Sequence, residues 1–199
     1  MDDLTRSAHI QKELEEYKRL VQFTSSGDVN LYELVIGRGS RICEEILLLI
    51  CLGKGYVVDS LGRVETEMGV VPVLQIFSRG GLAFQRIADD ILPGECQKFL
   101  RVFRTCRNIA VHVHEGEVSH VLTMEFAHAM DLFLLWFKEE YCNHDTLGTI
   151  TSRFFPLQDV LSFPDELPVD QGTIAPRNCL LQKLAEQSDL LLKLSSQLS

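Results

Sequence analysis

The sequence lacks the marks of several common protein classes. Its six cysteines form no C-x-x-C pair, so neither a zinc site nor a redox dithiol is expected. The longest apolar run, Ile46–Leu52, is too short to span a bilayer and suits a buried helix. The first residues are acidic, whereas a secretory signal would be basic. We therefore expect a cytoplasmic protein with no membrane contact, no metal and no cofactor, in which the cysteines are buried reduced thiols.

Sequence signatures of several enzyme classes are also absent. There is no G-x-S-x-G and no H-E-x-x-H motif, and the glycine-containing segment 37–40 is neither a P-loop nor a complete dinucleotide fingerprint. His112 and His114 lie two residues apart, about 200° around a helix, so they cannot chelate one metal ion from it. The sequence thus indicates no metal or nucleotide cofactor site.

Basic residues are outnumbered by acidic ones. With 19 Lys and Arg against 28 Asp and Glu, the formal net charge is −9, which argues against broad, nonspecific nucleic-acid binding. The net charge does not argue against a local basic cleft, because four basic residues recur every three positions. They are Lys98, Arg101, Arg104 and Arg107. Each neighbours the next while the row winds around its helix. Solvated charge on a helix surface explains the row equally well.

Helical periodicity dominates what is present, and 46% of the residues are hydrophobic. A chain of this length can bury a core, and we predict an all-α, up-and-down helical bundle. Residues 53–70, rich in glycine, predict a loop that could hold a short hairpin. Gly37 and Gly39 weaken one helical turn, and close packing against a neighbour would explain them. The predicted helices span residues 2–23, 29–52, 72–78, 82–91, 95–113, 117–141 and 176 onward.

The C-terminal third changes character. Four of the six prolines and three phenylalanines lie in residues 143–176, which excludes a long helix there and predicts a strap lying on the bundle. The last helix carries leucines at coiled-coil a/d spacing, over fewer than three heptads, and breaks off at Ser199, which leaves open that the chain is a fragment. We divide the chain into a bundle (1–142), the strap (143–176) and an amphipathic helix (177–199). The a/d leucines are Leu180, Leu184, Leu191, Leu194 and Leu198, with Gln187 in the same row.

The most informative stretch is Arg107–His112, near the end of the predicted helix 95–113. It combines a permanent cation, an amide and an imidazole within two helical turns. Arg107 is followed directly by the polar Asn108, and four residues separate Arg107 from His112. This pattern resembles the motif of the HEPN superfamily. The preceding Phe99–Arg104 and the following aromatic helix are similar to the branch of that family found at the front of some restriction and helicase proteins. The resemblance covers residues 1–141.

The resemblance implies a helical bundle that dimerises and places two motifs across one cleft. Many members of the family cut RNA without a metal, and others are noncatalytic binding modules. RNA, a second copy of the chain, and an antitoxin or a larger defence complex are therefore the implied partners. The catalytic candidates are Arg107, Asn108 and His112, and the substrate-binding candidates are Lys98, Arg101, Arg104 and His114.

These residue types suit attack of a ribose 2′-hydroxyl on its neighbouring phosphate, which DNA cannot undergo. His112 would transfer protons, Arg107 would hold the phosphate oxygens, and Asn108 would orient His112 or the phosphate. Arg107 and His112 lie about 140° apart around a helix. One helix therefore cannot aim both squarely at one phosphate unless the Arg side chain bends around or the end of the helix distorts. A two-fold partner that supplies a second Arg and His would relieve this problem.

Two further hypotheses stay open. The chain could be a noncatalytic HEPN-like interaction domain whose strap and final helix mediate assembly, and the acidic balance favours this. It could also be an unrelated helical scaffold, in which Arg107 forms a surface ion pair and Asn108 is a polar group at a helix end. In that scaffold His112 would be a hydrogen-bonded, half-buried side chain.

Overall fold

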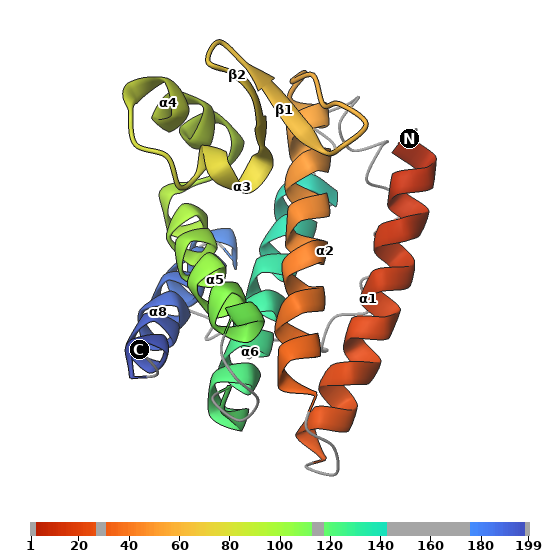
Figure 1. The fold of residues 1–199 in the computed structure, drawn as a ribbon, viewed down its shortest axis with the longest axis vertical. Helices are drawn as coiled ribbons and strands as arrows, with labels where there is room; N and C mark the ends of the chain where they lie inside the picture. Colours follow the sequence, from red (N-terminus) through yellow and green to blue (C-terminus); the bar gives the residue numbers. More distant parts are fainter. Residues whose placement is uncertain (1–2, 27–30, 113–117, 143–175, 198–199) are drawn as a thin grey trace.

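The computed structural model describes residues 3–26, 31–112, 118–142 and 176–197. Figure 1 shows that its main helices run up and down beside one another, so the predicted all-α, up-and-down bundle is confirmed. The helices of the bundle are α1 (Asp3–Ser25), α2 (Tyr32–Gly53), α5 (Gly94–His112), α6 (His120–Phe137) and α8 (Pro176–Ser196).

A small hairpin and two short helices lie at the end of the bundle where α2 finishes (Figure 1). Strands β1 (Arg63–Thr66) and β2 (Gly69–Pro72) pair antiparallel, with Thr66 opposite Gly69. Gly69 has a φ of +102°, a conformation that glycine adopts without strain. Helices α3 (Val73–Ile76) and α4 (Leu82–Ile91) follow. The loop with a short hairpin predicted for residues 53–70 is therefore present, with β2 extending two residues further.

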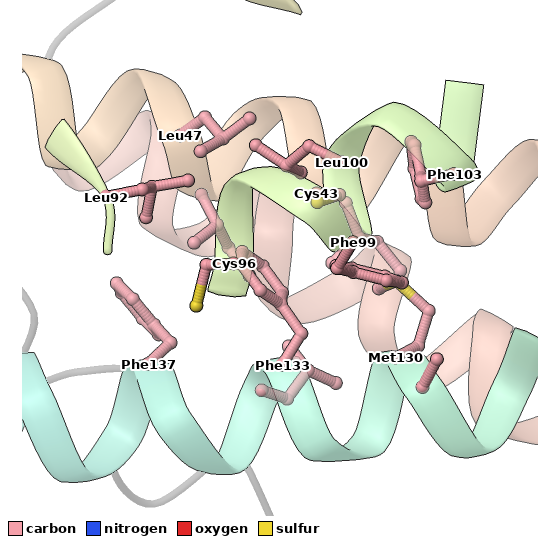
Figure 2. Close-up of a cluster of buried hydrophobic side chains, with 14 of the residues drawn as sticks. Cys43, Leu47, Leu92, Cys96, Phe99, Leu100, Phe103, Met130, Phe133 and Phe137 are labelled. Carbon is pink, nitrogen blue, oxygen red and sulfur yellow. The ribbon is translucent and has the colours of Figure 1, made fainter. Parts of the chain in front are cut away.

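The rotation of α5 about its own axis is set by its apolar stripe. The buried residues recur every three or four positions, which is the spacing of one helical face. In Figure 2, Phe99 lies between Cys43 of α2 and Phe133 of α6, and the Phe99 and Phe133 ring centroids are 5.5 Å apart. The opposite face of α5 must therefore point to solvent. The stripe consists of Cys96, Phe99, Leu100, Phe103, Cys106 and Ala110, and Gln97 and Val102 of α5 are buried as well.

Helix α6 differs from its predicted bounds at both ends. It begins at His120 because the Ser119 hydroxyl caps it, accepting a hydrogen bond from the backbone N–H of Leu122 at 3.1 Å. At the other end the chain continues as a π-helix, η1 (Lys138–Cys142). The helical segment as a whole therefore reaches the end that the sequence predicted for it.

Helix α8 packs its leucine face against α5 and α6 of the same chain. Leu184 and Leu191 are fully buried, and the Gln187 amide donates to the backbone carbonyl of Glu125 on α6 at 3.0 Å. Within the described residues, Leu180, Leu184 and Leu191 of this row are therefore already covered by the same chain. Assembly through that row, which one hypothesis invoked, would first require α8 to leave the bundle. The predicted strap falls almost wholly on residues 143–175, which lie outside the described residues.

Free thiols are carried by Cys43, Cys51, Cys96, Cys106 and Cys179, and the first four are buried, in agreement with the prediction of reduced core thiols. Burial raises the pKa of the Cys51 and Cys106 thiols to about 12, which keeps them protonated and unreactive at neutral pH. Across the described helices, none combines the length and the apolar character needed to cross a membrane.

The two glycines of α2 offer a matched test of the packing. A Cβ at position 39 would lie 2.8 Å from the Phe126 ring and 3.1 Å from the Tyr17 ring, whereas one at position 37 would meet nothing within 4 Å. Gly39→Ala should lower the free energy of unfolding by about 1–3 kcal/mol because the rings must shift. Gly37→Ala should raise it by about 0.4–1 kcal/mol through helix propensity and a stiffer unfolded chain. Urea denaturation measures both, and changes of the same sign would contradict this packing.

Candidate functional site

Arg107 lies on the edge of α5 that faces α2. Its Nη1 donates to Oε1 of Glu44 at 2.9 Å, and the two side chains are 43% and 32% exposed. A guanidinium carries five N–H donors, so one contact leaves most of the fork available. The contact fixes the position of a cation at the boundary of two helices while keeping it open to solvent.

The carboxyl of Glu44 is poorly solvated where it stands. Burial raises its pKa above the ordinary value, and this effect outweighs the Arg107 guanidinium, which acts in the opposite direction. An ion pair whose carboxylate loses more in desolvation than it gains from its partner contributes little to stability. The ion pair therefore serves to hold the Arg107 guanidinium in place more than to stabilise the fold.

The other predicted residues of α5 separate into two groups. Arg101, Arg104 and Asn108 are exposed on the outward face, and no ion pair joins them to any described residue. Lys98 lies on the opposite edge of the helix, where its Nζ is 2.5 Å from Oδ1 of Asp189 on α8. The basic row thus winds from α8 to α2, and only its second half gathers near Arg107.

The histidines cannot be placed to the same degree. His112 is the last residue of α5, and its side chain lies outside the description, as does the whole of His114. Convergence of Arg107 and His112 on one phosphate therefore stays a prediction. The structure does show where the Arg107 side chain points: it contacts α2 and remains partly exposed to solvent.

Sequence reasoning missed Glu44. Its partner Arg107 is 63 residues away, and no spacing rule connects residues on two different helices at that separation. The one available signal is that Glu44 and Glu45 interrupt an otherwise apolar stretch of α2. Paired carboxylates on a buried helix need a local reason, and here a cation from α5 supplies it.

A hollow of about 270 Å³ lies beside the ion pair. We call it the Glu44 hollow. It is bounded by one face of α2, by the loop that precedes β1, and by the junction of β2 and α3. A larger groove of about 780 Å³, between the hairpin turn and α4, includes none of the candidate residues. The Glu44 hollow is lined by Glu44, Glu45, Leu48, Ser60, Leu61, Gly62, Pro72 and Val73.

No cluster of three or more His, Cys, Asp or Glu side chains able to hold a metal ion occurs within the described ranges. No family model, no curated protein and no solved structure matches this chain. Its function must therefore be inferred from the residues of the site.

The pKa of Glu44 predicts how stability depends on pH. A raised pKa in the folded state gives a stabilisation that is complete below the ordinary carboxyl pKa and is lost as the pH rises through the raised value. Glu44→Gln, which cannot ionise, should match the wild type near pH 4 and be the more stable protein near pH 8.

Urea denaturation at both pH values measures this difference. Glu65→Gln, on the exposed face of β1, is the matched control and should shift stability by less than about 0.5 kcal/mol. If Glu44→Gln instead loses stability relative to the wild type as the pH rises, the ion pair outweighs burial and the account of Glu44 is wrong.

Proposed function

We propose that this protein is a metal-independent endoribonuclease that acts as a homodimer, with its site on the C-terminal half of α5. The observation that carries the proposal is the Arg107–Glu44 pair, which holds a guanidinium in place and leaves it 43% exposed. A planar guanidinium fixed in this way is suited to binding phosphate oxygens through two parallel hydrogen bonds.

The neighbours of Arg107 extend this phosphate site. Arg104 lies one turn before it, and Arg101 one turn further back, both on the exposed face of α5. The protein as a whole carries a net charge of −9, so RNA is repelled from most of its surface. A short basic path on an acidic protein favours one strand bound at one place.

The proposed reaction needs only side chains. The ribose 2′-oxygen attacks the adjacent phosphorus, the bond to the 5′-oxygen breaks, and the products are a 2′,3′-cyclic phosphate and a 5′-hydroxyl. His112 of one copy takes the proton from the 2′-hydroxyl, and His112 of the second copy delivers a proton to the leaving 5′-oxygen. Arg107 stabilises the charge that develops on the nonbridging oxygens. Asn108, one residue after Arg107, orients the imidazole or the phosphate.

A second copy of the chain completes this site. Residue 112 lies five positions beyond Arg107, about 140° around the helix, and Arg107 is committed to the α2 side. Exposed apolar side chains at the end of the bundle where α5 finishes and α2 and α6 begin (Figure 1) favour such a contact. They are Leu34, Val111 and Val121, which are 55%, 63% and 54% exposed.

A noncatalytic interaction domain is the second candidate. The formal net charge of −9 favours it, because an acidic surface repels RNA and leaves a protein as the better partner. An antitoxin or a larger defence complex as the partner comes from the resemblance to the HEPN superfamily alone. A role as a toxin or defence effector has the same basis.

Cleavage of labelled RNA in the presence of EDTA tests the proposal. Arg107→Ala should lower the rate about 10²–10³-fold by removing charge stabilisation, and His112→Ala about 10²–10⁴-fold by removing proton transfer. Arg86→Ala, an exposed arginine on α4, is the control and should cleave like the wild type.

Light scattering on the same samples reports the oligomeric state, and a dimer is expected. Cleavage that survives both site substitutions would come from a contaminant and would end the nuclease proposal. An active but strictly monomeric protein would contradict the proposal that two copies of the chain share one cleft.

A further inference from the structure

The Glu44 hollow and the candidate phosphate site share one residue, Glu44. Glu44 holds Arg107 through Oε1 and also forms part of the wall of the hollow. In a nucleotide, the base lies one sugar away from the phosphate. A ligand whose phosphate binds Arg107 can therefore place its base in the hollow without leaving the α2 surface.

The lining of the hollow suits the flat faces and polar edge of a base. Leu48 and Val73 are 4% and 3% exposed and form an apolar floor, against which an unstacked base can pack. Leu61 is 73% exposed at the rim and can cover the outer face of a base. The volume of about 270 Å³ is near the lower limit for ligand pockets, which fits one base and excludes a larger ligand.

The polar groups of the wall determine which base fits. Glu44 and Glu45 present carboxylate oxygens, and Ser60 presents a hydroxyl. An ionised carboxylate only accepts hydrogen bonds, and it has about four lone-pair sites. The single contact with Arg107 therefore leaves acceptor capacity on Glu44. A base that offers adjacent N–H donors is favoured, and one that offers carbonyl oxygens is repelled.

We infer that the Glu44 hollow is a nucleobase subsite that selects guanine, with Glu44 accepting from N1–H and the N2 amino group. This inference rests on the proposed RNA substrate. Guanine is the base whose Watson–Crick edge carries two adjacent donors, so it can form a bidentate contact with one carboxylate. Uracil offers a single N–H between two carbonyl oxygens and is disfavoured. Cytosine and adenine, with one amino group beside an acceptor, are intermediate.

Calorimetric binding of nucleoside 3′-monophosphates to the full chain tests this selectivity without relying on cleavage. Guanosine 3′-monophosphate should bind about tenfold more tightly than uridine 3′-monophosphate, or better, as expected for a bidentate base contact. Inorganic phosphate, which reports the Arg107 site alone, should bind more weakly than either nucleotide.

Two variants separate the hollow from the phosphate site. Glu44→Gln keeps an oxygen that can accept from Arg107 but lacks the second carboxylate oxygen, so the preference for guanine should fall to about twofold or less while phosphate still binds. Ser60→Phe fills the hollow from its exposed rim and should reduce the affinity for guanosine 3′-monophosphate to that for inorganic phosphate. Glu65→Gln, outside the hollow, is the control and should keep the preference.

Equal affinities for the four nucleotides, no nucleotide binding at all, or a guanine preference that survives both variants would overturn the subsite. These outcomes are distinct from failure of the nuclease proposal. A protein that binds guanosine 3′-monophosphate selectively but never cleaves RNA supports the hollow and refutes the nuclease. A protein that cleaves RNA without base preference supports the nuclease proposal and refutes the guanine subsite.

Discussion

The burial of one face of α5 determines where every candidate residue lies. Phe99 and Phe103 are fully buried, and turning the helix would expose aromatic surface whose burial is worth roughly 1.5–3 kcal/mol per side chain. With that face held between α2 and α6, Arg107 must meet α2 and Asn108 must face solvent. The candidate site is therefore a consequence of core packing, since none of its own contacts is strong enough to set the helix rotation.

The Arg107–Glu44 pair shows how a stable core can support a site that is itself not optimised for stability. Burial raises the pKa of Glu44 despite the neighbouring cation, so the ionised carboxylate is disfavoured by folding. The buried aromatic cluster offsets this easily. In return, the guanidinium is held between two helices with most of its donors unused, which is the state that a phosphate ligand requires.

Much of the fold was predictable because it depends on local periodicity. The bounds of α4, Leu82–Ile91, match the prediction because two glycines precede the helix and a proline follows it. The close packing predicted for two glycines holds for Gly39 but not for Gly37, where an added Cβ would meet nothing within 4 Å. Periodicity locates a weak turn, but it does not show which of its residues faces a partner. The hairpin strands depend on tertiary contacts such as Gly62 against Leu48, which a single sequence does not reveal.

The site was predictable only in part, because a sequence pattern reveals local spacing but not contacts between distant elements. Arg107, Asn108 and His112 form a local pattern, whereas Glu44 and the hollow beside it depend on α2, the loop before β1 and the start of α3 meeting in space. The leucines of α8 show a second limit of sequence-based prediction. Their spacing is typical of a helix that packs on another helix, and it does not tell whether that helix belongs to the same chain.

The most direct measurement of the central claim is a charge reversal across the pair. It compares Arg107→Glu, Glu44→Arg and the double variant for stability and for RNA cleavage. Each single variant should be destabilised, because it places two like charges in contact. The double variant should recover stability but stay inactive, because the guanidinium then projects from α2 instead of α5. Full recovery of cleavage by the double variant would contradict the claim that the position of Arg107 on α5 makes the site.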